Sequence, residues 1–326
     1  MQSQEYGYAK WSVGQRCTGV DEAAVDRALA EGSILRIHVL RPTWHYVRSR
    51  DIRWMLAVTA PRVRGMMAPY DRPLELDESL YARCNDLIVT ALEGGEHLTR
   101  AQLSEVLAAG GVEARGQRLG HVVMRAELDA LICSGVPRGK QITYALVSDR
   151  APDAVLLDAD AALAELTRRY FTSHGPATEK DFRWWATLTA RDARRGLEMG
   201  ANELERWSAG EWTFFWVPTE PAAPEEPGSV VQLLQVYDEC IVGYTESRKV
   251  LDVGGLAWGT GVAIPYPHLL LVEGQLAGRW RRTVRRTGIV VEAQTVRRLT
   301  RSEWRGVEHV VEQYGRFSGL DAALVK

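Results

Sequence analysis

The sequence is short of lysine, of closely spaced cysteines and of long apolar stretches. Its four cysteines form no CxxC pair and its seven histidines show no metal-ligand spacing, which argues against a zinc cluster and a disulfide framework. No apolar run approaches the length that crosses a bilayer, and the first residues lack the basic and apolar regions of a signal peptide. We therefore expect reduced thiols, no metal, no membrane contact and a cytoplasmic protein.

The common cofactor motifs are missing as well. The chain contains no Walker A loop, no dinucleotide-binding glycine fingerprint, no HExxH pair and no nucleophile elbow. Gly254-Gly255 and Gly259-Thr260-Gly261 are too loosely spaced to form a phosphate-binding loop. We expect no cofactor.

Arginine takes the place of the missing lysine. It supplies 35 of the 40 basic residues in a chain of formal net charge -2, with seven arginines in residues 41–72 and nine in residues 279–305. Arginine binds phosphate through paired hydrogen bonds, so these two windows suit an anionic partner. A GC-rich genome that encodes arginine on solvated faces produces the same bias, and composition alone leaves the two explanations about equal.

Length and hydropathy pattern predict several modules. A chain of 326 residues, 46% of them hydrophobic, should form two to four units that each bury an apolar face. Pro61 is expected to end one of the helices of the first unit. The elements expected in this unit are a helix over 21–31, strands over 34–40 and 43–47, and helices over 49–59 and 77–92.

A helix-turn-helix pattern follows. Thr99 and Gln102 form a capping box ahead of a helix that ends at Gly110-Gly111, and a second helix is expected over 117–133. The β-rich residues 140–147 stand where a wing is expected. Three side chains share one face of the second helix and are candidates for DNA contact: Arg118, His121 and Arg125.

A similar order of elements recurs further along the chain. Helices are predicted over 158–171, 178–188 and 189–199, and strands over 213–217, 230–236, 268–272 and 288–293, with a closing helix near 301–314. The pattern predicts an α+β fold of tandem winged-helix (helix-turn-helix) modules with a C-terminal β-rich domain. The expected winged helices are 1–93, 94–150 and 151–217, followed by a Pro-rich linker at 218–229 and the β-rich domain at 230–326.

Short strings spread along the chain resemble those of a known family. They are Gln2-Ser3-Gln4, Leu40-Arg41-Pro42-Thr43-Trp44-His45, the run LTRAQL at 98–103, His174-Gly175-Pro176-Ala177-Thr178 with DFRWW at 181–185, and Tyr237-Asp238-Glu239 with Gly243-Tyr244. Their order over essentially the whole chain resembles the AlkZ/YcaQ-type winged-helix DNA glycosylase family. The resemblance implies tandem winged helices in a concave arrangement, and double-stranded DNA carrying alkylated bases as the partner of a nucleoid-associated protein.

The resemblance also implies a catalytic pair. The family motif is a glutamine, a variable residue and a second glutamine, which Gln2, Ser3 and Gln4 match. Alkylation at N7 or N3 leaves a purine cationic and a good leaving group, so the enzyme has chiefly to stabilise an oxocarbenium-like sugar and orient water, and a glutamine carbonyl can do both. Members usually have a helix ahead of this motif. We therefore expect an N-terminally incomplete first winged helix, a poorly held catalytic pair and weak activity.

Several other residues have two interpretations. Arg41 and His45 either contact phosphate or fix the turn between the two strands. The adjacent Trp184 and Trp185 either stack on an exposed base or pack in the core, and core packing is expected for at least one of them. The carboxylates of Asp238 and Glu239 either place water or pair with an arginine such as Arg248. Four further basic residues are expected at the DNA: Lys180, Arg183, Arg281 and Arg282.

Two functions from different classes follow from these observations. The first is a monofunctional DNA glycosylase, most simply a monomer, that hydrolyses the N-glycosidic bond of alkylated purines, including bulky adducts or crosslinks in some members of the family. Only Lys10 lies near the motif as a candidate for lyase chemistry. The alternative is a non-catalytic winged-helix protein that acts as a transcription regulator or damage sensor.

Overall fold

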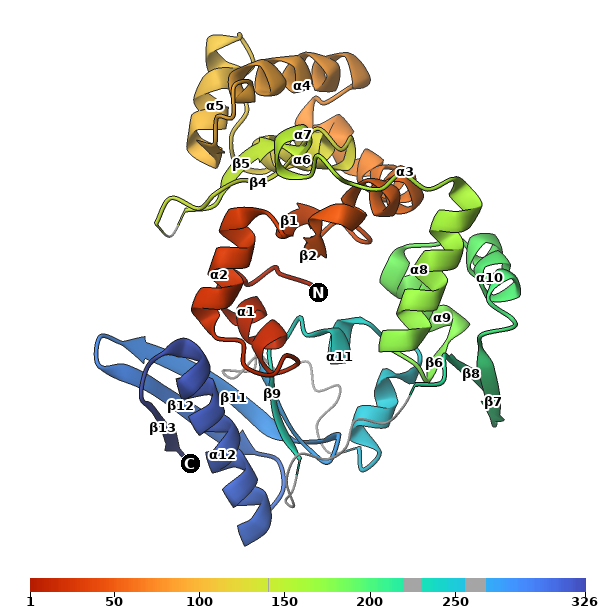
Figure 1. Ribbon diagram of the computed structural model, residues 1–326, viewed down its shortest axis with the longest axis vertical. Helices are drawn as coiled ribbons and strands as arrows, with labels where there is room; N and C mark the ends of the chain where they lie inside the picture. The colour runs from red at the N-terminus through yellow and green to blue at the C-terminus, as the bar shows by residue number, and fades with distance from the viewer. Residues whose placement is uncertain (140, 220–229, 256–267) are drawn as a thin grey trace.

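A computed structural model describes residues 1–139, 141–219, 230–255 and 268–326, and shows a mixed α+β fold built from four units (Figure 1). The first unit contains helices α1 (Tyr6–Gly14) and α2 (Glu22–Glu31) and strands β1 (Ile34–His38) and β2 (Trp44–Arg48). Residues 1–3 run beside β2, because Ser3 N donates to Trp44 O at 2.7 Å and Tyr46 N donates to Met1 O at 2.7 Å. Helix α3 (Ile52–Asp71) leads to the second unit.

The second and third units share one order of elements. The second contains α4 (Glu78–Leu92), β3 (Leu98–Thr99), α5 (Arg100–Ala109), α6 (Gly116–Leu128), β4 (Ile132–Ser134) and β5 (Thr143–Leu146), and the short α7 (Val147–Arg150) follows. The third contains α8 (Ala159–Ser173), β6 (Ala177–Thr178), α9 (Glu179–Ala186), α10 (Ala190–Met199), β7 (Glu205–Ala209) and β8 (Trp212–Trp216). In both sheets the last strand lies in the middle, in the orders β3-β5-β4 and β6-β8-β7.

The C-terminal unit is a five-stranded sheet with one long helix against it. Its strands lie in the order β13-β12-β11-β10-β9, antiparallel except for the pair β12 and β13. The elements are β9 (Val231–Leu234), α11 (Glu239–Val242), β10 (His268–Val272), β11 (Gln275–Arg285), β12 (Gly288–Thr295), α12 (Arg301–Ser318) and β13 (Ala322–Val325). Among the described residues, no helix is long and apolar enough to cross a membrane.

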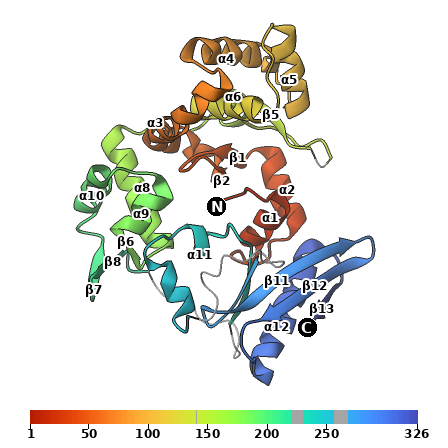
Figure 2. The same ribbon diagram turned by 180° about the vertical axis from the view of Figure 1, so that it is seen from behind.

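The first unit divides its apolar side chains between two cores. Leu35 and Ile37 of β1 pack into a core with α3, α8 and α9, whereas Trp11 of α1 packs with Trp280 of β11 and Tyr314 of α12. The second unit has a core of its own. The expectation that every unit buries its own apolar face is therefore wrong for the first unit. Because the first unit packs into both cores, the N-terminal segment lies in the middle of the molecule, between α1, α8 and α11 (Figure 2).

Several predicted boundaries are confirmed. Thr99 and Gln102 form the predicted capping box, and Thr178 and Thr189 cap the helices predicted to begin there. The four cysteines are free thiols.

Other boundaries are wrong. Helix α3 runs through Pro61 to Asp71, because its buried face, including Leu56 and Val63, packs into the core and outweighs the roughly 3 kcal/mol that an internal proline costs. Helix α6 ends at Leu128 rather than near Cys133, which lies in a strand, because Ala130 takes a positive φ of 57°. The predictions for Lys140 and for residues 220–229 of the linker lie outside the described residues.

Candidate active site

Gln2 is buried at the junction of three units, with only 4% of the residue exposed. Its backbone N donates a 2.6 Å hydrogen bond to Glu239 Oε1, and its side-chain Oε1 accepts a 2.9 Å bond from Arg41 Nη2. Both backbone and amide are therefore fixed. The prediction that this end of the chain is poorly held is wrong for Gln2, because strand pairing and these two bonds tie it down.

Arg41 holds Gln2 rather than facing solvent. Its Nη1 donates to Trp185 O at 3.0 Å and its Nη2 lies 3.2 Å from His45 Nε2. His45 Nδ1 lies 2.9 Å from Thr43 O, and since a carbonyl only accepts, Nδ1 carries the proton and Nε2 accepts from Arg41. Burial, reinforced by the Arg41 charge, lowers the pKa of His45 well below its usual value. The imidazole is therefore neutral.

Glu239 is the negative charge of this site. Its Oε2 accepts from Trp185 Nε1 at 2.9 Å and lies 3.3 Å from His174 Nε2. Burial raises the pKa of Glu239, but the Met1 ammonium, the His174 hydrogen bond and the Arg41 charge outweigh it and hold the pKa well below the usual value. This buried carboxylate thus stays ionised, because donors surround it.

The two glutamines of the motif have different surroundings. Ser3 is fully buried, whereas Gln4 is exposed, and its side chain bonds to none of the residues that the structure describes. The side chain of Gln4 is therefore free to approach a substrate, whereas the side chain of Gln2 is held in one orientation by Arg41. Two amides, one fixed and one free, are suited to orienting water and stabilising positive charge on a sugar.

Arg282 is the other predicted residue that lies close to the motif. Its guanidinium lies 4.1 Å from the ring of Tyr8, and a Cβ on Gly7 would lie 3.0 Å from its Nη2. Arg281 pairs instead with Glu292 across the sheet at 2.5 Å. The two adjacent arginines thus point away from each other, as the alternation of a strand predicts.

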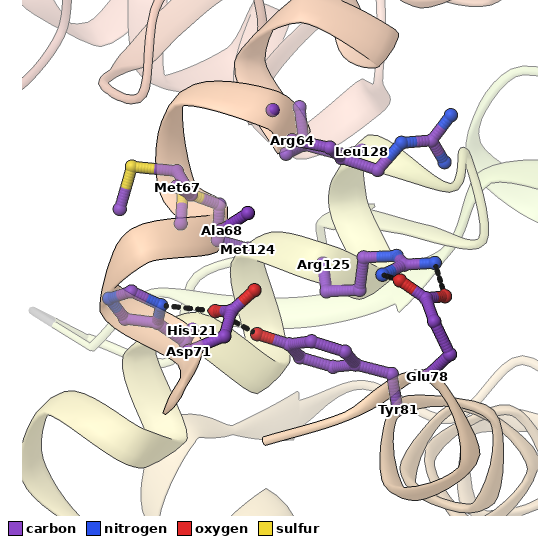
Figure 3. Close-up of a pocket in the computed structure, with 11 residues that line it drawn as sticks. Arg64, Met67, Ala68, Asp71, Glu78, Tyr81, His121, Met124, Arg125 and Leu128 are labelled. Atoms are coloured by element: carbon purple, nitrogen blue, oxygen red, sulfur yellow. Dashed lines mark hydrogen bonds and ion pairs between the residues drawn. The ribbon is translucent and has the colours of Figure 1, made fainter. Parts of the chain in front are cut away.

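The face with Arg118, His121 and Arg125 is not brought to Gln2. His121 and Arg125 line a pocket of about 450 Å³ between α3, α4 and α6, and Arg118 lies outside its lining (Figure 3). His121 Nδ1 lies 3.2 Å from Asp71 and Arg118 lies 3.6 Å from Glu75, while Arg125 binds Glu78 at 2.6 Å and Asp129 at 2.9 Å. Each of these groups thus has a carboxylate partner within the protein, and their contact with DNA stays a prediction.

Helix α9 presents its basic residues on a different side from Trp185. Lys180 forms an ion pair with Glu246, and Arg183 is half-buried with its Nε unpartnered in the part of the chain that is described. Trp184 is 49% exposed and donates to Val242 O at 3.0 Å, whereas Trp185 is buried. The prediction that at least one of the two tryptophans lies in the core is confirmed by Trp185.

The sequence did not predict that Glu239 binds Gln2 and Trp185. Its neighbour Asp238 pairs with Arg16 at 2.5 Å and accepts from Ser12 Oγ at 2.6 Å, so the carboxylate pair serves two sets of partners from the N-terminal segment. The predicted pairing with an arginine is confirmed for Asp238, with Arg16 of the N-terminal segment as the partner. In the sequence, Glu239 stands out as one of a carboxylate pair and within the string Tyr237-Asp238-Glu239, and neither feature predicts its bond to Gln2.

The neutral state of His45 predicts a pH dependence of stability. Its folded pKa lies below the unfolded value, so the unfolded chain takes up this proton first, and stability present above about pH 6.5 is lost as the pH falls. We expect His45→Gln to flatten the fall of the unfolding free energy between pH 7 and 5 by up to about 1.4 kcal/mol per pH unit. Urea unfolding at several pH values measures it. The exposed His309→Gln is the control, and equal slopes for the two variants would contradict the assignment.

Comparison with known proteins defines the class to which this fold and site belong. A family model described as DNA glycosylase AlkZ-like matches residues 1–317, which identifies the class as DNA glycosylases. Since the match covers nearly the whole chain, the chain belongs to the AlkZ-like DNA glycosylase family.

A similar curated protein and a similar solved structure both come from Streptomyces sahachiroi. The chain is 24% identical over 298 residues to an interstrand DNA cross-link repair glycosylase. The alignment covers 86% of this chain and 79% of that protein. The solved structure of Streptomyces sahachiroi DNA glycosylase AlkZ has a TM-score of 0.78 and 21% identity, covering 100% of this chain and 91% of that one. The likeness of the structures shows that the fold is shared.

Proposed function

We propose that the chain is a monofunctional DNA glycosylase that hydrolyses the N-glycosidic bond of N7- or N3-alkylated purines in duplex DNA. The observation that carries the proposal is the pair of amides at positions 2 and 4, one locked by Arg41 and one exposed, in a member of a DNA glycosylase family. An alkylated purine leaves as a neutral base, so the protein supplies placement of water and stabilisation of the sugar cation.

The state of Lys10 supports a monofunctional reaction. Lys10 is buried, and its Nζ lies 2.6 Å from Glu22 and 3.0 Å from Asp26, so two carboxylates of the protein already bind this amine. We expect borohydride to trap no covalent complex with DNA, and Lys10→Met to release bases at the rate of the unaltered protein wherever it remains folded. A trapped complex that disappears in Lys10→Met would show lyase chemistry instead.

We infer that the first three units are winged helices in tandem. The order helix, strand, helix, helix, strand, strand with the last strand in the middle of the sheet occurs in both the second and the third unit. The first unit begins with residues 1–3, which pair with β2 through a bridge at Gln2. It continues with the same order of helix, helix, strand, strand, and β2 lies between Gln2 and β1. This arrangement supports three tandem units followed by a β-rich domain at 230–326. The third unit fits the proposed 151–217, whereas α4 belongs with the second unit and not with the proposed 1–93.

We propose that phosphate contacts come from Lys180, Arg183, Arg281 and Arg282. Arg282 lies beside the segment that follows Gln4, and Lys180 forms an exposed pair that a DNA phosphate can displace. Arg41 and His45 belong to the support of Gln2, and Arg118, His121 and Arg125 to the packing of α6. The cross-link activity in the name of the relative extends the proposed substrates to bulky adducts and interstrand crosslinks.

A series of adducts tests the proposal. Duplexes carrying N7-alkylguanines of increasing size should each lose the modified base, with free base and abasic site formed in equal amounts. The alternative function, a non-catalytic regulator or damage sensor, predicts binding without base release, and sequence-specific binding with an intact adduct would replace the proposal by it.

A further inference from the structure

We propose that Trp185, on α9 of the third unit, is a positioning residue that holds Gln2 by its backbone and by its side chain at once. The inference rests on the proposed function, since it concerns the presentation of the Gln2 amide to a substrate.

The hydrogen bonds around Gln2 close a ring through Trp185. On one side, Trp185 Nε1 donates to Glu239 Oε2 at 2.9 Å, and Glu239 Oε1 accepts from Gln2 N at 2.6 Å. On the other side, Trp185 O accepts from Arg41 Nη1 at 3.0 Å, and Arg41 Nη2 donates to Gln2 Oε1 at 2.9 Å. Trp185 thus binds both of the residues that bind Gln2: its indole N–H binds Glu239, and its carbonyl binds Arg41.

The ring determines which atom of the Gln2 amide is occupied and which atom is left without a bond in the protein. A guanidinium has donors and no acceptor, so the atom that Arg41 binds is the amide oxygen. The amide nitrogen of Gln2 then has no partner among the residues that the structure describes. Pre-set orientation of this kind is what catalysis by a neutral amide requires, because the group must be held within a fraction of an ångström.

The ring crosses three units. Gln2 and Arg41 belong to the first unit, Trp185 to the third and Glu239 to α11 of the C-terminal unit. All four residues are buried, so a lost bond is not replaced by water. Docking of the third unit therefore decides whether the motif is in its working position, although the third unit contributes none of the motif residues.

Trp184 provides a matched control. It is the neighbouring tryptophan on the same helix, and its Nε1 also donates to the C-terminal segment, at Val242 O, but outside the ring. Trp185→Phe removes the ring's indole N–H and keeps an aromatic side chain beside Tyr170 and His174. Trp184→Phe removes an equivalent N–H without touching the ring.

Single-turnover release of 7-methylguanine from duplex DNA separates positioning from binding. We expect Trp185→Phe to lower the rate at saturating protein at least about 10-fold while Kd for the duplex changes less than about 2-fold, and Trp184→Phe to leave both within about 2-fold. Equal losses in both variants, or a loss confined to Kd, would overturn the positioning role. If Trp185→Phe does not fold, Glu239→Gln opens the same side of the ring and takes its place.

A second readout is independent of activity. In protein labelled with ¹⁵N at glutamine, the backbone and side-chain signals of Gln2, assigned by loss in Gln2→Ala, should shift or broaden in Trp185→Phe and stay in place in Trp184→Phe. Unchanged Gln2 signals in Trp185→Phe would overturn the proposal. If the unaltered protein releases no base, the proposed function fails by itself, and the Gln2 signals still decide whether the ring positions this amide.

Discussion

Replacing Gln4 by alanine is expected to lower base release about 100-fold without changing stability. The side chain is exposed and bonds to no described residue, so its loss leaves no buried group unpaired. An amide that stabilises the transition state contributes a factor of about 10²–10³ when it is removed. The measurement is the single-turnover rate of abasic-site formation, read by alkaline strand cleavage, alongside the urea midpoint.

Gln2→Ala should behave differently. It also lowers the rate, and it leaves Arg41 Nη2 without its amide acceptor in a buried site, which costs about 1–3 kcal/mol of unfolding free energy. Gln117→Ala, an exposed glutamine on α6, serves as the control and should change neither quantity. Full activity in Gln4→Ala would remove this residue from the catalytic pair.

Arg41→Met is expected to destabilise the protein by about 3–5 kcal/mol, because it removes a buried positive charge beside a buried carboxylate. Methionine keeps much of the apolar stem but leaves Gln2 Oε1 and Trp185 O without their donor. Base release should fall in the fraction that stays folded. Urea unfolding measures the loss of free energy.

The exposed Arg48→Met, on the strand that also carries His45, is the control for Arg41→Met and should stay within about 0.5 kcal/mol of the unaltered protein. An equally small effect of Arg41→Met would mean that Arg41 does not hold the site together. Phosphate contact by Arg41, the other interpretation of the sequence, would then regain support.

Local signals explain what was predictable in the fold. The capping pair Thr99 and Gln102 acts within one turn of helix, so sequence alone locates the start of α5. The bounds of strand β11 were not predicted, because Arg279, Arg281, Arg282 and Arg285 interrupt its apolar pattern. Helix α3 continues past Pro61 because tertiary packing outweighs a local rule.

The candidate site was less predictable, because its contacts are long-range. Gln2 and Glu239 lie 237 positions apart, and no spacing rule connects them. A chain end is expected to fray, yet pairing with β2 and the bond from Arg41 hold Gln2 in place. The motif glutamines themselves came only from the family resemblance, and the difference between buried Gln2 and exposed Gln4 came only from the structure.

The most direct test of the central claim is the release of free 7-methylguanine from duplex DNA by the unaltered protein and by the Gln2→Ala, Gln4→Ala double variant at equal DNA occupancy. The account predicts free base and abasic sites in equal amounts with the unaltered protein, and a loss of at least about 100-fold in the double variant. Tight DNA binding with no base released by the unaltered protein would contradict it.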